Sequence, residues 1–126
     1  MKPETAEWVD KAEGDWKVAQ REIQTADPVW NVVCFLAEQC AEKYLKAFLE
    51  VHNIVYGKTH DLVMLLNLSG GLLPELDSQR QPLAHLSTFG IAARYPGMSA
   101  DRQAAENAMS TAKEVRAVVR AKLGFP

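Results

Sequence analysis

Three groups of polar residues could carry chemistry in a chain that is otherwise rich in apolar sequence. They are Glu38, Gln39, Glu42, Lys43 and Lys46 within one apolar run, then His60 and Asp61, and finally Arg94 and Tyr95 ahead of Pro96. An arginine presents paired N–H donors that fit a phosphate, and a histidine carries a proton near neutral pH. Each group also has an ordinary structural explanation, because Arg94 would suit the end of a helix and the lysines could form a solvated face.

Metal-dependent and covalent chemistry find little support in the sequence. The histidines His52, His60 and His85 lie in different segments, and there is no His-Glu-x-x-His motif or paired cysteine spacing. Gly70 and Gly71 follow a helical pattern as a stop signal, and no Gly-x-Ser-x-Gly motif occurs. We therefore expect no metal site and no cofactor.

The composition is that of one soluble domain. The chain has 126 residues, 48% hydrophobic and 24% charged, which fits a single domain over residues 1–126. A net charge of −2 excludes a protein that holds nucleic acid by bulk positive charge. Cys34 and Cys40 lie in an apolar run, where we expect free, buried thiols. Since there is no signal-peptide pattern and no apolar run long enough to span a bilayer, we expect a cytoplasmic protein.

The hydrophobic pattern predicts helices and no strands. Apolar residues recur every three or four positions over about 3–25, 29–52, 60–68 and 99–123, and a further helix follows Pro82 or begins a turn before it. Thr59 and Ser99 are the expected N-caps of the third and last helices, and Gly124 is the expected end of the last one. The predicted fold is an all-α, up-down bundle of three long and two short helices.

The second predicted helix is apolar on more faces than one neighbouring helix can cover. Phe35, Leu45 and Leu49 widen the apolar stripe that runs from Val33 to Val51. Such a helix is either central to a bundle or shared with a second subunit. We therefore expect a homodimer, in which polar groups from both chains could line one cleft.

Three short stretches, taken in order, resemble a known family. They are "FLAEQCAEKYLKAFLEV" (35–51), "KTHDLVMLL" (58–66) and "ARYPG" (93–97). In this order and at this spacing they are similar to the HEPN domain (higher eukaryotes and prokaryotes nucleotide-binding), in particular to small prokaryotic members with an Arg-Tyr-Pro motif. The resemblance covers most of the chain. It implies a small helical bundle that dimerises, and many members are encoded beside a minimal nucleotidyltransferase, as in toxin–antitoxin pairs.

The resemblance gives roles to the three polar groups. Gln39, Glu42, Lys43 and Lys46 match the polar pattern of the family's second helix, His60 and Asp61 match its Thr-His-Asp-Leu, and Arg94 and Tyr95 match its Arg-Tyr-Pro-Asp. Gly97 replaces the usual aspartate, so one carboxylate of the pattern is missing. The implied function is a nucleotide- or RNA-phosphate-binding subunit that works with a nucleotidyltransferase partner.

Two alternatives stay open. Members of the family's ribonuclease branch carry an arginine, four to six residues and a histidine, and Arg80 and His85 in "RQPLAH" match that spacing. The arginine there supports the phosphate charge and the histidine handles the proton of the 2′-hydroxyl, which implies a metal-independent endoribonuclease. Gln81 stands where that branch favours a small polar residue, and Pro82 disfavours a regular helix within the motif. The other alternative is a plain homodimeric interaction module.

Overall fold

In the computed structural model, which describes residues 1–92 and 95–126, the chain folds into helices joined by turns. Three helices are long: α1 (Pro3–Ile23), α2 (Trp30–Val51) and α6 (Arg102–Leu123). Between α2 and α6 lie the short α3 (Leu62–Leu68), the 3-10 helix η1 (Pro74–Gln79), α4 (Arg80–Ser87) and α5 (Phe89–Ala92). The described residues contain no β-strand, which confirms the predicted all-α class.

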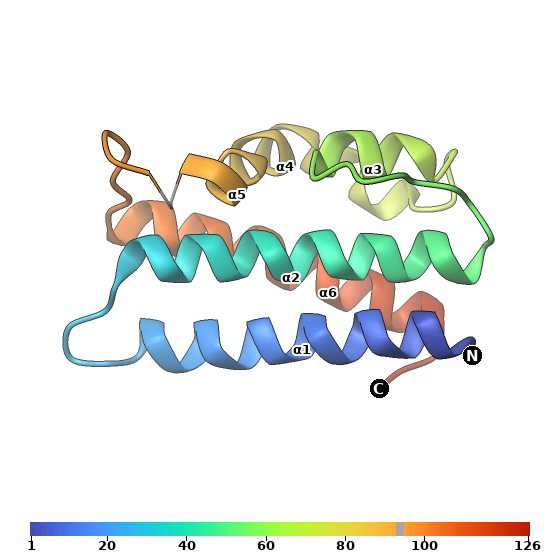
Figure 1. The fold of residues 1–126 in the computed structure, drawn as a ribbon, viewed down its shortest axis with the longest axis horizontal. Coiled ribbons are helices and arrows are strands. Elements are labelled where there is room, and N and C mark those ends of the chain that lie inside the picture. Colours follow the sequence, from blue (N-terminus) through green and yellow to red (C-terminus); the bar gives the residue numbers. More distant parts are fainter. Residues whose placement is uncertain (93–94) are drawn as a thin grey trace.

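The helices form the predicted up-down bundle (Figure 1). The helix α2 runs along the middle, antiparallel to α1, which lies on one side of it. On the other side, α3, α4 and α5 lead the chain back in the direction opposite to α2, and α6 then returns along α2. Because α2 contacts every other α-helix that the structure describes, a side chain on α2 can be reached from several elements.

The helix α2 is the buried centre of this bundle. From Cys40 to Leu49, every residue except Lys43 is at most 5% exposed. The sequence predicted that this wide apolar surface is either central to a bundle or shared with a second subunit. Other helices of the same chain cover it. Cys34 and Cys40 are free and buried, as predicted. Burial raises the pKa of the Cys34 thiol to about 11, so this thiol stays protonated and unreactive at neutral pH.

Both predicted N-caps, Thr59 and Ser99, were wrong by two residues. The cap of α3 is Asp61, whose carboxylate accepts two N–H groups of the first turn at 3.0 and 3.2 Å. The cap of α6 is Asp101, which accepts one first-turn N–H at 2.8 Å. A carboxylate is favoured at this place because it satisfies the unpaired N–H groups and also faces the positive end of the helix dipole.

The segment predicted as the fourth helix consists of consecutive short pieces. The helix α4 begins at Arg80, ahead of Pro82, which is tolerated because the first turn of a helix needs no N–H donor. Thr88 separates α4 from α5. Gly124 ends α6 in the left-handed conformation with φ of +83°, as predicted. None of the helices in the described part of the chain combines the length and hydrophobicity that a membrane crossing requires.

Candidate functional site

A cavity of about 730 Å³ lies between α2, the turn that precedes α3, and the junction of α4 with α5. Its walls are formed by Phe35, Gln39, Thr59, His60, Asp61, Ser87, Thr88, Gly90 and Ile91. We call this cavity the His60 pocket. Its volume falls in the range of small-molecule sites, and three of the predicted site residues, Gln39, His60 and Asp61, line it.

The imidazole of His60 is held in place by a buried carboxylate. Its Nδ1 lies 3.1 Å from both oxygens of Glu42, while 72% of its side chain stays exposed. A carboxylate at Nδ1 favours the form in which Nδ1 carries the proton, and the opposite nitrogen, Nε2, is then left to other partners. The described residues offer no hydrogen bond to Nε2. The ring of His60 is therefore fixed through Nδ1 and largely exposed elsewhere.

The second partner of Glu42 is Lys46, one helical turn further along α2. The Lys46 ammonium lies 3.1 Å from Glu42 Oε2 and only 5% of the residue is exposed. It also lies 5.5 Å from the ring centre of Trp8 and 5.9 Å from that of Tyr56. Burial alone would raise the pKa of Glu42, but hydrogen bonds from His60 and Lys46 outweigh it and lower that pKa. Glu42 is therefore ionised at neutral pH, and Lys46 is committed to balancing its charge.

Glu38, which belongs to the polar group of this helix but not to the residues matched to the family, completes this buried group. Glu38 is fully buried, and the Gln39 amide donates to its Oε2 at 2.7 Å. Its Oε1 has no hydrogen-bond partner with an N–H or O–H group in the described structure. Burial, and then the neighbouring charge of Glu42, raise the pKa of Glu38 to about 8. The sequence named Glu38 as one polar residue of this helix but did not predict its full burial, because a glutamate is ordinarily exposed.

Gly90 of α5 lies directly against the Glu38 carboxyl group. A Cβ atom at position 90 would stand 3.0 Å from Glu38 Cδ and Oε2. Since Gly90 also lines the His60 pocket, α5 can approach α2 this closely only with a glycine here. The glycine therefore sets the spacing between the two walls of the pocket.

The other predicted site residues lie elsewhere or have other partners. Lys43 points toward α1, where its ammonium pairs with Asp15 Oδ2 at 2.6 Å. Asp61 lines the His60 pocket but uses its carboxylate for the cap of α3. Tyr95 is 61% exposed. Arg94 lies outside the described residues.

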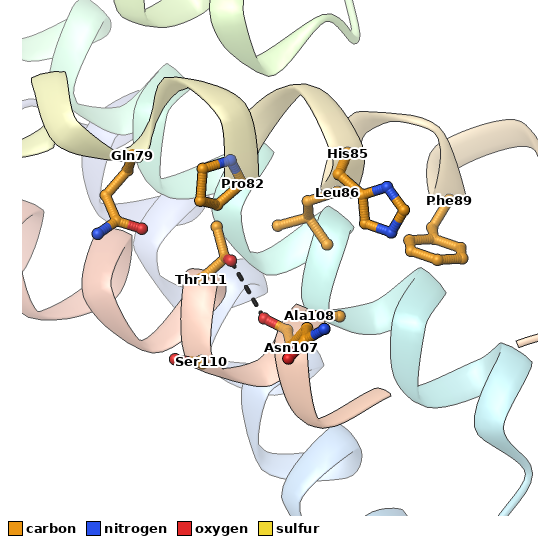
Figure 2. A pocket seen from close by; sticks show the side chains of 9 residues that line it. All are labelled: Gln79, Pro82, His85, Leu86, Phe89, Asn107, Ala108, Ser110 and Thr111. Carbon is orange, nitrogen blue, oxygen red and sulfur yellow. Dashed lines mark hydrogen bonds between the residues drawn. The ribbon is translucent and has the colours of Figure 1, made fainter. Parts of the chain in front are cut away.

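Arg80 and His85 are not brought to a common site. The Arg80 guanidinium donates to Asn67 and lies 3.4 Å from Asp77 Oδ1, both on the surface. His85 instead faces a groove between α4 and α6, where its ring meets that of Phe89 edge to face at 5.5 Å (Figure 2). Residues five positions apart on an α-helix point about 140° away from each other, so the side chains of Arg80 and His85 face different surroundings.

Metal-ligating side chains do not gather in the described structure. Over residues 1–92 and 95–126, no group of three or more histidine, cysteine, aspartate or glutamate side chains is arranged to hold a metal ion. The pocket chemistry that this part of the chain offers is that of an imidazole, an amide and buried carboxyl groups.

Comparisons with protein families and with solved structures show which proteins this chain is similar to. The profile of the HEPN domain matches residues 5–122. Among solved structures, TT1696 from Thermus thermophilus has 23% sequence identity and a TM-score of 0.77, over 96% of this chain and 99% of its own. ST0689, described as an archaeal HEPN homologue, has 22% identity and a TM-score of 0.75, over 98% and 99%. No curated protein sequence matches the chain significantly.

At these identities the two solved structures show a shared fold. The profile match extends from the first turn of α1 to the last turn of α6 and includes every helix that lines the His60 pocket. The chain belongs to the HEPN domain family.

Proposed function

We propose that this HEPN protein is a nucleotide- or RNA-phosphate-binding subunit and that the His60 pocket is its ligand site. The observation that carries the proposal is the imidazole of His60, fixed by the buried Glu42 carboxylate on the wall of a 730 Å³ cavity. A histidine held through one ring nitrogen offers the other nitrogen to a phosphate oxygen or a ribose hydroxyl.

The lining of the pocket offers both kinds of contact that a nucleotide needs. Phe35 and Ile91 are apolar lining residues and suit the face of a base. Gln39 and His60 also line the pocket, and their side chains form hydrogen bonds with polar groups. Arg94 follows Ile91 by three residues in the sequence, and we assign the phosphate to its guanidinium because of its paired donors.

Titration calorimetry with AMP tests this assignment. We expect His60→Ala and Arg94→Ala each to weaken AMP binding roughly 10-fold or more, the loss expected for a hydrogen bond to a charged group. His52→Ala is the matched control, because His52 caps the C-terminal end of α2 and does not line the pocket. Unchanged AMP affinity in both His60→Ala and Arg94→Ala would contradict the proposal.

We also propose two protein partners. The resemblance to members encoded beside a minimal nucleotidyltransferase supports a complex with such a protein in the cytoplasm, which co-purification of the two proteins would test.

A homodimer is supported by exposed apolar side chains beside the pocket: Val32, at 41% exposure, lies one turn before Phe35, and Ile91 is 65% exposed. Light scattering that finds a monomer would count against the dimer and against a plain homodimeric module.

The endoribonuclease alternative has its own measurement. Incubation of a structured RNA with the protein in excess chelator should leave the RNA intact, because Arg80 and His85 face different surroundings. Cleavage that is lost in His85→Ala would instead make the protein a metal-independent endoribonuclease.

A further inference from the structure

The groove between α4 and α6 is a second concave surface, distinct from the His60 pocket. It encloses about 280 Å³, and Figure 2 shows His85 and Phe89 on its upper wall and Asn107 and Ser110 on α6 below. Apart from the imidazole, every described side chain that lines it is uncharged at all pH values. A groove of this kind favours an uncharged polar group over a phosphate or a cation.

The exposed ring of His85 provides a surface for a flat ligand. The rings of His85 and Phe89 stand at 89° to each other with centroids 5.5 Å apart, so they form a corner rather than a closed stack. The imidazole of His85 is exposed and a heteroaromatic ring can lie against it, whereas Phe89, at 7% exposure, belongs to the core and holds the imidazole from one side. Such rings in RNA are the bases, which single-stranded RNA presents unstacked to aromatic and histidine side chains.

Asn107 supplies hydrogen-bonding capacity at the same place. Its Oδ1 accepts the Gln103 amide at 2.9 Å, which leaves its two N–H donors for another partner. Thr111 cannot serve equally, because its hydroxyl already donates to the backbone carbonyl of Asn107 at 3.1 Å (Figure 2). The donors of Asn107 match the carbonyl and ring-nitrogen acceptors on the edge of a base.

The groove and the His60 pocket lie on two sides of one segment. Leu86 and Phe89 line the groove, whereas Thr88 and Gly90, which alternate with them, line the pocket. A helical segment is about 10–12 Å across with its side chains, so a ligand that reaches both cavities has to extend around this segment.

We propose that the groove between α4 and α6 is a nucleobase subsite, in which His85 contacts a base through its ring and Asn107 bonds the edge of that base. This inference rests on the proposed function of the His60 pocket and makes its ligand a single-stranded RNA of several nucleotides. His85 then acts as a binding residue and not as a general acid or base. The separate engagement of Arg80 with Asn67 and Asp77 supports that assignment.

The test compares AMP with the trinucleotides ApApA and UpUpU, titrated in excess chelator. We expect at least one trinucleotide to bind more tightly than AMP. His85→Ala should weaken trinucleotide binding roughly 5- to 150-fold, the range found when a stacking side chain is truncated to alanine. His85→Phe keeps a flat ring and should stay within about threefold of wild type. Asn107→Ala, on the other wall, should weaken binding and change the preference between the two trinucleotides.

Three results would overturn the inference. They are trinucleotide affinity unaffected by His85→Ala and Asn107→Ala, equal losses in His85→Phe and His85→Ala, and cleavage of a trinucleotide by wild type that His85→Phe abolishes. Failure of the proposed function looks different, because AMP binding would then be insensitive to His60→Ala. If AMP binding depended on His85 and not on His60, the groove would be the mononucleotide site. A single strand that occupies both the groove and the His60 pocket would then be excluded.

Discussion

The carboxyl group of Glu38 shows how two acids can be neighbours in the interior of one helix. Ionisation of both Glu38 and Glu42 would place two negative charges beside the ammonium of Lys46. Burial and the charge of Glu42 instead keep Glu38 protonated, so that Glu42 and Lys46 form a neutral buried pair. The proton on Glu38 is therefore part of the fold at neutral pH.

This proton predicts how stability depends on pH. The pKa of Glu38 rises from its ordinary 4.5 to about 8 on folding. Between these values the folded protein holds a proton that the unfolded chain has released, so stability is greatest below about pH 4.5 with respect to this group and falls as the pH rises to about 8. The Glu38→Gln variant has no ionisable group at this position, so its stability does not fall in this way as the pH rises. Its stability relative to wild type should rise by up to about 1.4 kcal/mol per pH unit in that window.

Urea unfolding followed by circular dichroism at pH 5.5, 6.5 and 7.5 measures this difference. A constant stability difference between Glu38→Gln and wild type across the three pH values would show that Glu38 is ionised in the folded protein. Measurement above pH 5 avoids the range in which Glu42, whose pKa is lowered on folding, loses its own contribution as the pH falls.

Gly90 gives a second prediction at the same scale. Gly90→Ala places a Cβ 3.0 Å from the Glu38 carboxyl carbon, and we expect a loss of about 1–3 kcal/mol because the fully buried side chain has little room to move. Gly14→Ala is the matched control, since Gly14 is a helical glycine whose new Cβ meets nothing within 4 Å. That control should be more stable than wild type by about 0.5–1 kcal/mol. Equal stability of the two variants in thermal unfolding would contradict the close contact.

At the scale of elements, the short helix α3 places the key histidine. A helix of seven residues is not stable alone, so α3 depends on its packing and its cap. Asp61 provides the cap, and the Ser87 hydroxyl accepts the Leu62 N–H at 2.8 Å, which ties the start of α3 to α4. His60 directly precedes this anchored residue. The cap therefore fixes His60 as well as α3.

Two variants distinguish a capping role of Asp61 from direct contact with the ligand. Asp61→Ala should reduce stability by about 0.5–2 kcal/mol and weaken AMP binding as well, because the turn that carries His60 loosens. Asp61→Asn retains an oxygen for capping and should preserve stability and AMP affinity. Asp101→Ala, which removes the cap of α6 far along the chain, should lower stability and spare affinity. If Asp61→Asn folds normally but loses AMP binding, its carboxylate contacts the ligand directly.

At the scale of the whole molecule, one polar network joins α1, α2 and α6. Glu13 of α1 accepts two hydrogen bonds from Arg116 of α6, at 2.7 and 2.8 Å. It also accepts a hydrogen bond from the hydroxyl group of Tyr44 on α2. The same hydroxyl oxygen accepts a hydrogen bond from Arg120 at 3.1 Å. The hydrogen bond from Arg116 is the main reason that the pKa of Glu13 is lowered. These four side chains are satisfied by each other, which indicates a structural role.

Removal of the central carboxylate should therefore affect stability and spare function. We expect Glu13→Ala to lose about 1.5–3 kcal/mol in urea unfolding, because Tyr44 and two arginines lose a charged partner. The loss should shrink as the pH falls below the ordinary 4.5 of a glutamate, where wild type also begins to lose the contribution of this carboxylate. AMP affinity should stay unchanged, since Glu13 does not line the His60 pocket. A stability equal to wild type would show that the network contributes nothing net.

Much of the fold follows from local patterns in the sequence. The recurrence of apolar residues every three or four positions predicted α1, α2 and α6 within about two residues at most ends, because burial of one helix face is a local property of the chain. The caps were harder to place. Thr59 and Asp61 both have capping side chains, and the backbone N–H groups that each can reach depend on where the turn begins.

The site was predicted as separate fragments, and only packing could sort them. The sequence by itself determined the helices, the family motifs and the polar residues Gln39, Glu42 and His60 as candidates. The tertiary structure decided that Glu42 and His60 form a hydrogen bond across 18 positions of the sequence, that Lys43 turns toward α1, and that the carboxyl group of Glu38 lies against Gly90. The physical reason is that periodicity specifies which face of a helix is buried, whereas contacts between distant residues depend on how the helices pack against one another.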